Sequence, residues 1–278
     1  MYKLIAIDID GTLINDYHQV PEDVKSTITE AKKLGIKIVL CSGRPIGGMR
    51  SYIEVLDLNE AEDYAIAYNG AFVQATKNGD IISELSLGHN DLVKLYGLSL
   101  ELNTPMHFFD IESLYTPNSN ISEYTVVETY LNKIPLYYRE IKDIPQDLSI
   151  PKIMYIDKPI KLTETIRSLP KDIQETYTVV QSAPYFLEFV HPSASKGNAV
   201  KNLANKLGIK QEEVMCIGDN GNDLSMITYA GCGVAMGNAI PEVKAVADFQ
   251  TRTNNKSGVA YAIEKIALEP IRALSKQD

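Results

Sequence analysis

The chain has 278 residues, 45% of them hydrophobic and 23% charged, and a formal net charge of −9 at pH 7. This is the composition of a globular protein with one or two domains, while the acidic balance argues against a nucleic-acid partner, which would require a basic face. No apolar run is long enough to cross a bilayer, and the N-terminus reaches two carboxylates within ten residues, unlike a secretory signal. We therefore expect no membrane partner and a cytoplasmic location.

Short apolar runs alternate with helical repeats in the first third of the chain. The pattern predicts strands over 4–9, 36–41 and 64–68 and helices over 21–34 and 46–56. Strand, helix and strand at this spacing indicate βαβ units and a parallel sheet.

The middle of the chain, residues 83–187, has a different character. It is richer in Tyr and Pro and mixes alternating strand patterns, as in 152–156 and 185–190, with helical stretches such as 90–102 and 161–169. We expect an α+β domain inserted into an α/β domain that is formed by residues 1–82 and 188–278.

In the last third of the chain, strand and helix patterns alternate again as they do in the first third. The pattern predicts strands over 214–217 and 233–236 and helices over 196–207, 222–229, 240–247 and 258–267. The outer segments are therefore expected to fold together into one sheet.

The three cysteines and four histidines form no ligand pattern. Cys41, Cys216 and Cys232 lie in or beside apolar runs and form no C-x-x-C pair, which favours buried thiols over disulfides or a zinc site. A bound metal is therefore expected to have oxygen ligands.

The sharpest motif is Asp8-Ile9-Asp10-Gly11-Thr12, directly after the first predicted strand. Strand alternation places Asp8 and Asp10 on one side, at the sheet edge where α/β proteins bind ligands. Two such carboxylates require a cation or a proton between them, and one can attack phosphorus while the other moves a proton. The Thr12 hydroxyl can fix a carboxylate or a backbone group. The alternative is an acidic turn with no chemistry.

Two weaker motifs lie elsewhere in the chain, one after the second predicted strand and one at the start of a predicted helix. Ser42-Gly43-Arg44 offers a hydroxyl and backbone N–H groups to an anion, although it also fits an ordinary loop. Lys196 begins a predicted helix and could neutralise a phosphate oxygen. Taken alone, a solvated lysine is the commoner explanation at that position.

A fourth motif, Gly218-Asp219-Asn220-Gly221-Asn222-Asp223, follows a buried strand. Helix capping alone could explain its acids. A strand-end Asp219 beside Asp8 and Asp10 would instead complete an all-oxygen site that suits Mg²⁺.

Together the four motifs resemble those of the haloacid dehalogenase superfamily of phosphohydrolases, over the whole chain. The runs 68–71, 182–188 and 237–241 resemble the Cof-type subgroup of that superfamily and its sugar phosphatases. The resemblance implies a Rossmann-like, doubly wound α/β core, and an Mg²⁺-dependent phosphatase of small phosphorylated metabolites such as sugar phosphates.

The resemblance also implies a role for each acidic residue. Asp8 would form an aspartyl phosphate, and Asp10 would protonate the leaving oxygen and later deprotonate water. Mg²⁺ would be held by the Asp8 side chain, the Asp10 carbonyl and Asp219, with Asp223 acting through water. The remaining residues expected to bind phosphate or substrate are Ile9, Thr12, Ser42, Gly43, Arg44, Lys196 and Asn222.

The spacing of the motifs bears on the subtype. Ser42 follows Asp10 by 32 positions, and Lys196 follows Ser42 by 154. The insert therefore comes after the third strand, as in relatives with the α/β cap called C2, which covers the site and selects the substrate. A phosphomutase, whose relatives carry the cap between the first two motifs, and a non-catalytic sensor of phosphorylated metabolites are the alternatives. The expected partner is a small phosphorylated substrate, bound by a monomer or homodimer.

Overall fold

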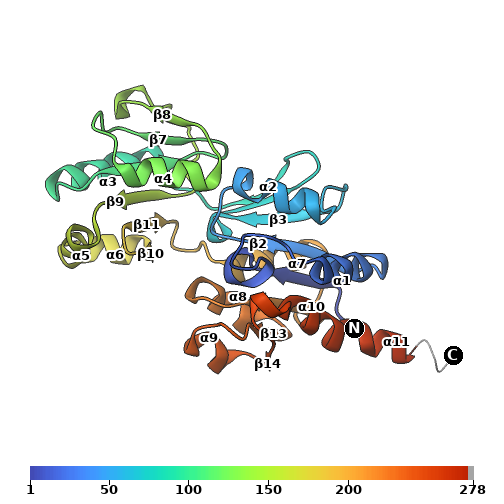
Figure 1. Cartoon of the computed structure of the whole chain (residues 1–278). Coiled ribbons are helices and arrows are strands. Elements are labelled where there is room, and N and C mark those ends of the chain that lie inside the picture. The colour runs from blue at the N-terminus through green and yellow to red at the C-terminus, as the bar shows by residue number, and fades with distance from the viewer. Residues whose placement is uncertain (275–278) are drawn as a thin grey trace. The chain divides into compact units, whose positions relative to one another are not determined.

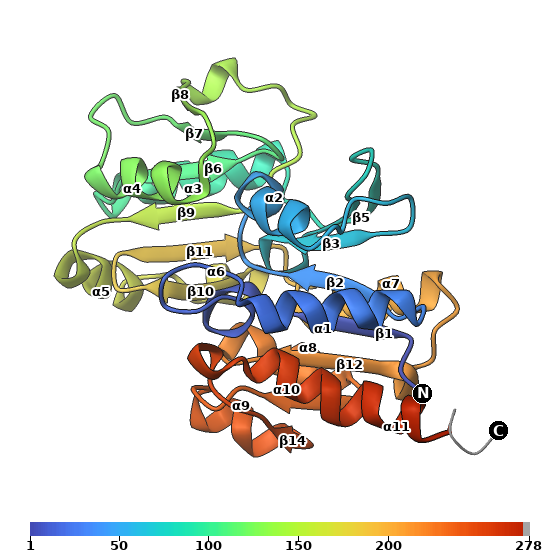
Figure 2. The same cartoon turned by 45° about the vertical axis from the view of Figure 1, so that its right-hand side comes forward.

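The computed structural model describes residues 1–274 and divides them into two compact units. The core unit comprises residues 1–43, 49–83 and those from Ser195 onward, and the inserted unit comprises 44–48 and 84–194. In Figures 1 and 2 the core unit is mostly blue and orange to red, and the inserted unit runs from teal through green to yellow. The chain thus leaves the core unit and returns to it.

The core unit is built on one eight-stranded sheet with the order β14-β13-β12-β1-β2-β3-β4-β5. Its six strands from β14 to β3 are parallel, and β4 pairs antiparallel with β3. The strands are β1 (Leu4–Ile7), β2 (Lys37–Cys41), β3 (Tyr64–Ala67), β4 (Phe72–Ala75), β5 (Ile81–Glu84), β12 (Val214–Gly218), β13 (Cys232–Ala235) and β14 (Phe249–Gln250). The first strand lies in the middle, between β2 and β12.

Helices cover both faces of this sheet, α1 and α10 on one and α7 and α8 on the other (Figures 1 and 2). The helices are α1 (Glu22–Lys33), α2 (Ile46–Val55), α7 (Lys196–Lys206), α8 (Leu224–Tyr229), α9 (Pro241–Val246), α10 (Gly258–Ile263) and α11 (Glu269–Leu274). Every residue of β1 is fully buried, as expected for a strand covered on both faces. The predicted α/β class is confirmed.

Some predicted elements are shorter in the structure. The strand predicted over 4–9 ends at Ile7, because the backbone, still extended at Asp8, turns over Ile9–Leu13. The helix predicted over 222–229 begins at Leu224, after a tight turn over Gly221–Asp223. The helix predicted over 258–267, by contrast, is helical throughout and runs further than predicted, because a π-helical turn over Glu264–Leu268 joins α10 to α11.

The inserted unit has a six-stranded sheet with the order β10-β11-β9-β6-β7-β8. Its neighbours pair antiparallel except β7 and β8. The strands are β6 (Met106–Phe109), β7 (Leu114–Thr116), β8 (Leu136–Tyr138), β9 (Ile153–Ile156), β10 (Thr178–Ala183) and β11 (Phe186–Val190). The helices are α3 (His89–Glu101), α4 (Glu123–Asn132), α5 (Pro159–Arg167) and α6 (Lys171–Thr176). The sequence places the return to the core at residue 188, within β11, whereas the division in the structure follows Ala194.

The two faces of this second sheet differ in chemistry. One face packs Phe108, Tyr155 and Phe189 into an apolar core with side chains of α3 and α5. On the other face the Lys152 Nζ lies 3.2 Å from Glu188 Oε1 and 3.6 Å from Glu128 Oε1 of α4. We call these three charged residues the inserted ion cluster. Within residues 1–274, no helix is both long and apolar enough to span a membrane.

Candidate active site

Asp8 stands at the carboxyl end of the central strand β1. Its backbone N–H continues the ladder by donating to Ile217 O at 3.0 Å, and its carbonyl accepts from Leu13 N at 3.1 Å. The turn from Asp8 to Leu13 requires glycine at position 11, because Gly11 has a φ of +77° and a Cβ there would lie 2.5 Å from Asp219 Oδ2. The chain therefore turns away sharply after Asp8. Asp8 itself, which is 5% exposed, remains at the edge of the sheet.

Lys196 joins two of the predicted acids. Its Nζ donates to Asp8 Oδ1 and to Asp223 Oδ1, both at 2.6 Å, and its side chain is fully buried. Burial by itself lowers the pKa of Lys196, but Asp223 and Asp8 outweigh burial and raise the pKa above its usual value. Lys196 is therefore a fixed positive charge, and we call Asp8, Lys196 and Asp223 the core ion cluster.

Asp223 holds the loop after β12 as well as the lysine. Its Oδ2 accepts from the backbone N–H groups of Asp219 at 2.9 Å and Asn220 at 3.0 Å. Gly218 allows this close approach, because a Cβ there would lie 2.6 Å from the Cβ of Asp223. Both Asp223 oxygens thus already accept hydrogen bonds from the protein.

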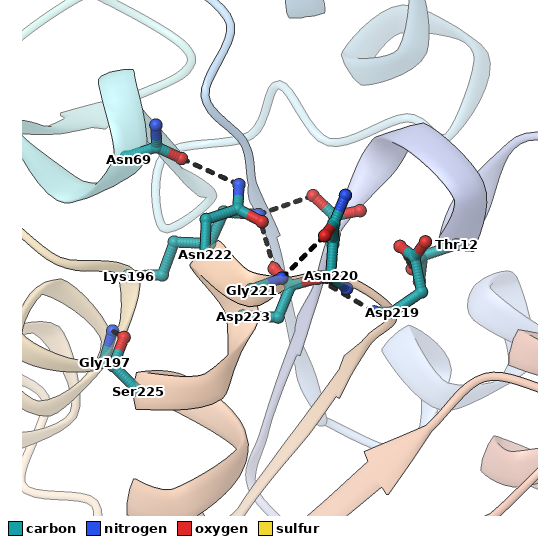
Figure 3. A network of polar contacts seen from close by, with 11 residues as sticks. Thr12, Asn69, Lys196, Gly197, Asp219, Asn220, Gly221, Asn222, Asp223 and Ser225 are labelled. Atoms are coloured by element: carbon teal, nitrogen blue, oxygen red, sulfur yellow. Dashed lines mark hydrogen bonds and ion pairs between the residues drawn. The ribbon is translucent and has the colours of Figure 1, made fainter. Parts of the chain in front are cut away.

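Asp219 lies on the other side of the site (Figure 3). Thr12 Oγ1 donates to Asp219 Oδ1 at 2.9 Å, so the first and fourth motifs are directly joined. Burial, followed by the charge of Asp223, raises the pKa of Asp219 to about 6, and Asp10 also contributes to the rise. Burial and Asp223 likewise hold the pKa of Asp8 well above its usual value, against the opposing effect of Lys196.

The acids form a site that fits a divalent cation. Carboxylate oxygens of Asp8, Asp219 and Asp223 all lie within 4.8 Å of one another. Three carboxylates against one ammonium leave negative charge that a cation would neutralise. An all-oxygen donor set is the kind that Mg²⁺ prefers. Asp10, two residues after Asp8, is exposed, and its charge contributes to the raised pKa of Asp219.

Some of the predicted phosphate-binding residues are connected to one another through Asn69. Ser42 is 2% exposed at the end of β2, and its carbonyl accepts from Asn69 N at 3.0 Å. Asn69 Oδ1 in turn accepts from Asn222 Nδ2 at 2.9 Å (Figure 3). A Cβ at Gly43 would lie 3.0 Å from Asn69 Oδ1. One asparagine therefore connects the second motif with the fourth.

Two predicted residues are placed differently from the rest. Arg44 belongs to the inserted unit, where its Nη1 donates to Gly48 O at 3.4 Å. Ile9 lies in the turn after β1, with a buried side chain and a carbonyl that accepts from Ile14 N at 3.2 Å.

Two asparagines near the site are absent from the predicted set. Besides Asn69, Asn238 supports the first motif by donating from Nδ2 to Gly11 O at 2.8 Å. Both belong to runs that carry the subgroup resemblance, which was the available signal. Their contacts span 153 positions for Asn69 to Asn222 and 227 for Asn238 to Gly11, so no local pattern indicates them.

Comparisons with known proteins agree with this geometry. Residues 5–263 match the family model of the haloacid dehalogenase-like hydrolases. The protein YxeH of Bacillus subtilis is 61% identical over 268 residues, covering 96% of this chain and 99% of its own. The B. subtilis 5-amino-6-(5-phospho-D-ribitylamino)uracil phosphatase YcsE is 31% identical over 261 residues, covering 94% of each chain.

Solved structures share the fold over almost the whole chain. A haloacid dehalogenase-like hydrolase from Bacteroides thetaiotaomicron has a TM-score of 0.87 and 35% identity, covering 96% of this chain and all of its own. The subclass IIB sugar phosphatase BT4131 has a TM-score of 0.76 and 25% identity, covering 95% of this chain and 98% of its own. With the family match and the named phosphatases, these findings make the chain a member of the haloacid dehalogenase-like hydrolase family and a phosphate-ester hydrolase.

Proposed function

We propose that this hydrolase is an Mg²⁺-dependent phosphatase of small phosphorylated metabolites that forms an aspartyl phosphate on Asp8. The observation that supports it most is the buried Asp8 at the end of β1, bound through Oδ1 to Lys196 at 2.6 Å and facing two further carboxylates. Because Lys196 occupies Oδ1, we assign the attack on phosphorus to Oδ2. The new Oδ2–P bond forms as the bond from phosphorus to the leaving oxygen breaks.

Asp10 is the proposed acid and base. Its carboxyl group donates a proton to the leaving oxygen, which departs as an alcohol. The resulting carboxylate then takes a proton from water, whose oxygen attacks phosphorus and releases Asp8 and inorganic phosphate. Its exposure is consistent with reaching both a leaving group and water.

The proposed cation ligands are Asp8, Asp219 and the Asp10 carbonyl. When bound, Mg²⁺ would neutralise charge on the nucleophile and on the phosphoryl oxygens. Asp223 serves mainly to hold Lys196 and the loop after β12, since its two oxygens already accept from them. Thr12 orients Asp219 through its hydroxyl. Ser42, Asn222 and the backbone N–H groups of Ile9 and Gly43 are the proposed donors to phosphate.

We infer that the substrates are phosphate esters of polyhydroxylated compounds, with sugar phosphates as the first choice. The named activities of BT4131 and YcsE concern a sugar phosphate and a phosphorylated ribityl chain. The sequence runs named above also resemble the bacterial sugar phosphatase YidA. The inserted unit, as a C2-type cap, is the proposed source of selectivity.

Phosphate release from a panel of sugar phosphates and phosphorylated cofactor fragments, with Mg²⁺ or with a chelator, tests the proposal. We expect release that requires Mg²⁺ and disappears in Asp8→Asn. Asp248→Asn is the control, because Asp248 accepts from Gly233 N at 2.7 Å elsewhere in the core unit.

Each alternative predicts a different result. A phosphomutase would isomerise a sugar phosphate without net release, and a sensor would bind without turnover. Equal release with and without the metal, or full activity of Asp8→Asn, would contradict the proposed mechanism.

A further inference from the structure

The segment Tyr68–Gly70, between β3 and β4, has an unusual backbone. Its three consecutive residues have φ values of +51°, +56° and +95°. This left-handed region is unfavourable for side-chain-bearing residues, above all for an aromatic one, and persists only where the surroundings impose it. We call this segment the 68–70 turn.

The surroundings that impose it are the proposed phosphate-binding loops. The Asn69 backbone N–H donates to Ser42 O at 3.0 Å, and its side-chain oxygen accepts from Asn222 Nδ2 at 2.9 Å. At the next position, a Cβ on Gly70 would lie 2.2 Å from Ser195 O and 3.1 Å from Lys196 N. The 68–70 turn therefore contacts the loops that carry Ser42, Asn222 and Lys196.

The buried side chain of Tyr68 holds this turn against the sheet. Its side chain is 1% exposed, and its ring packs edge-on against Phe72 of β4 with centroids 6.0 Å apart. The turn is thus tied to the sheet at one end and to α7 at the other. Asn69, between them, is held in a fixed position with only part of its surface exposed.

In the structure the Asn69 amide presents its Oδ1 to Asn222, and this contact sets which way the Asn222 amide faces. Asn69 Oδ1 can only accept, so it selects the orientation of Asn222 in which Nδ2 rather than Oδ1 is directed toward it. One N–H of that Nδ2 is used, and the other remains for an anion. With the amide reversed, Asn222 would present its oxygen, which repels phosphate.

We infer that Asn69 is a positioning residue for phosphate binding: its side chain orients the Asn222 amide, and its backbone holds the Ser42–Gly43 turn. The inference rests on the proposed function, because it takes Asn222 and Ser42 as phosphate donors. Asn69 acts through these residues and is not assigned a contact with substrate.

Asn69→Gly is the sharpest test. Glycine accepts the left-handed backbone and keeps the N–H to Ser42, so it removes the side-chain contact alone. Loss of one orienting hydrogen bond should raise KM and the dissociation constant of inorganic phosphate, measured by calorimetry with Mg²⁺, about tenfold. We expect kcat to change less than KM, whereas a purely structural role would reduce the active fraction and leave the phosphate affinity of the remainder unchanged.

A double-mutant cycle with Asn222→Ala identifies the route of the effect. If Asn69 acts through Asn222, adding Asn69→Gly to Asn222→Ala should weaken phosphate binding less than about twofold further. Fully additive effects would overturn the inference, as would unchanged phosphate affinity in Asn69→Gly.

Controls separate this inference from the proposed function. Asn103→Gly is matched, because Asn103 is also left-handed, with a φ of +48°, and lies in the inserted unit; its phosphate affinity should equal that of the wild type. Should Asn69→Gly not fold, Asn69→Ser replaces it, since Ser257 shows that serine adopts this backbone here, with a φ of +51°. A wild type without phosphatase activity would contradict the proposed function, whereas an active wild type with an unaffected Asn69→Gly would contradict only the role of Asn69.

Discussion

In the described part of the chain, residues 1–274, each unit buries a lysine between two carboxylates, and the two clusters differ in what surrounds them. Lys196 of the core ion cluster lies 2.6 Å from both Asp8 and Asp223. Lys152 of the inserted ion cluster lies 3.2 and 3.6 Å from its two glutamates and 4.8 Å from the centre of the Phe109 ring. Both lysines are 3% exposed or less.

The surroundings of each cluster distinguish a candidate active site from a group of charges that is buried only by packing. The core ion cluster lies at the carboxyl ends of parallel strands, where Asp219 adds a third carboxylate and Asp10 a nearby charge. The inserted ion cluster lies on a sheet face against Phe109 and beside the buried His107. A buried lysine between acids is therefore not by itself a sign of catalysis. The core ion cluster is distinguished by its additional carboxylates and by its position at the sheet edge where the parallel strands end.

The largest effect expected from this contrast concerns activity. Asp8→Asn should lower the rate of phosphate release by at least about 10³-fold, because an amide cannot replace the carboxylate that we propose as the nucleophile. Glu188→Gln, the matched change in the inserted ion cluster, should keep the release from a small aryl phosphate within about threefold of the wild type. A comparable loss in both variants would remove the distinction between the clusters.

Stability gives the next largest effect. Lys152→Met should lower the free energy of unfolding by about 3–5 kcal/mol, because it leaves Glu128 and Glu188 buried without their cation. Urea denaturation measures this loss. Adding Glu128→Leu and Glu188→Leu should recover much of it, and a loss below about 1 kcal/mol in the single variant would show that the cluster is not held as described.

The third effect is a pH dependence of stability. Burial, followed by the charge of Lys152, holds the pKa of His107 well below its usual 6.5, between Thr125 and Met154. Below pH 6.5 the unfolded chain therefore binds a proton that the folded chain does not, so the unfolding free energy falls as the pH falls.

The comparison with His107→Gln measures this contribution. The wild type should lose up to about 1.4 kcal/mol per pH unit more than the variant below pH 6.5. The difference between the two proteins is required, because burial also raises the pKa of the nearby Glu128, which favours the folded state as the pH falls toward 4.5. Parallel curves would contradict a neutral, buried His107.

The smallest effect comes from an exposed pair in the same unit. Lys94 lies 3.0 Å from Asp172, with side chains 44% and 63% exposed. Lys94→Met should change the unfolding free energy by less than about 1 kcal/mol, since water screens the pair. A loss as large as that of Lys152→Met would mean that burial does not set the difference.

Sequence patterns predicted the core site better than the inserted ion cluster, for a physical reason. Asp8 and Asp219 each follow an apolar strand, and parallel strands bring such ends to one edge, so local pattern and topology suffice. Lys196 alone resembles a solvated lysine at a helix start, and only the family resemblance and the fold place it between two acids. Glu128 and Glu188 come from α4 and β11, and Lys152 directly precedes β9, so their meeting depends on a strand register that no local pattern reveals.

The position of β1 has a consequence for the order of folding. Leu4 pairs with Lys37 on one side and with Val214 on the other, so the central strand lacks one neighbour until residues beyond 210 have left the ribosome. The inserted unit is nearly continuous in sequence and becomes complete earlier. We expect it to collapse first during synthesis and to shorten the loop that must close before β12 docks. We therefore expect the site around the proposed nucleophile, Asp8, to form only among the last steps of folding.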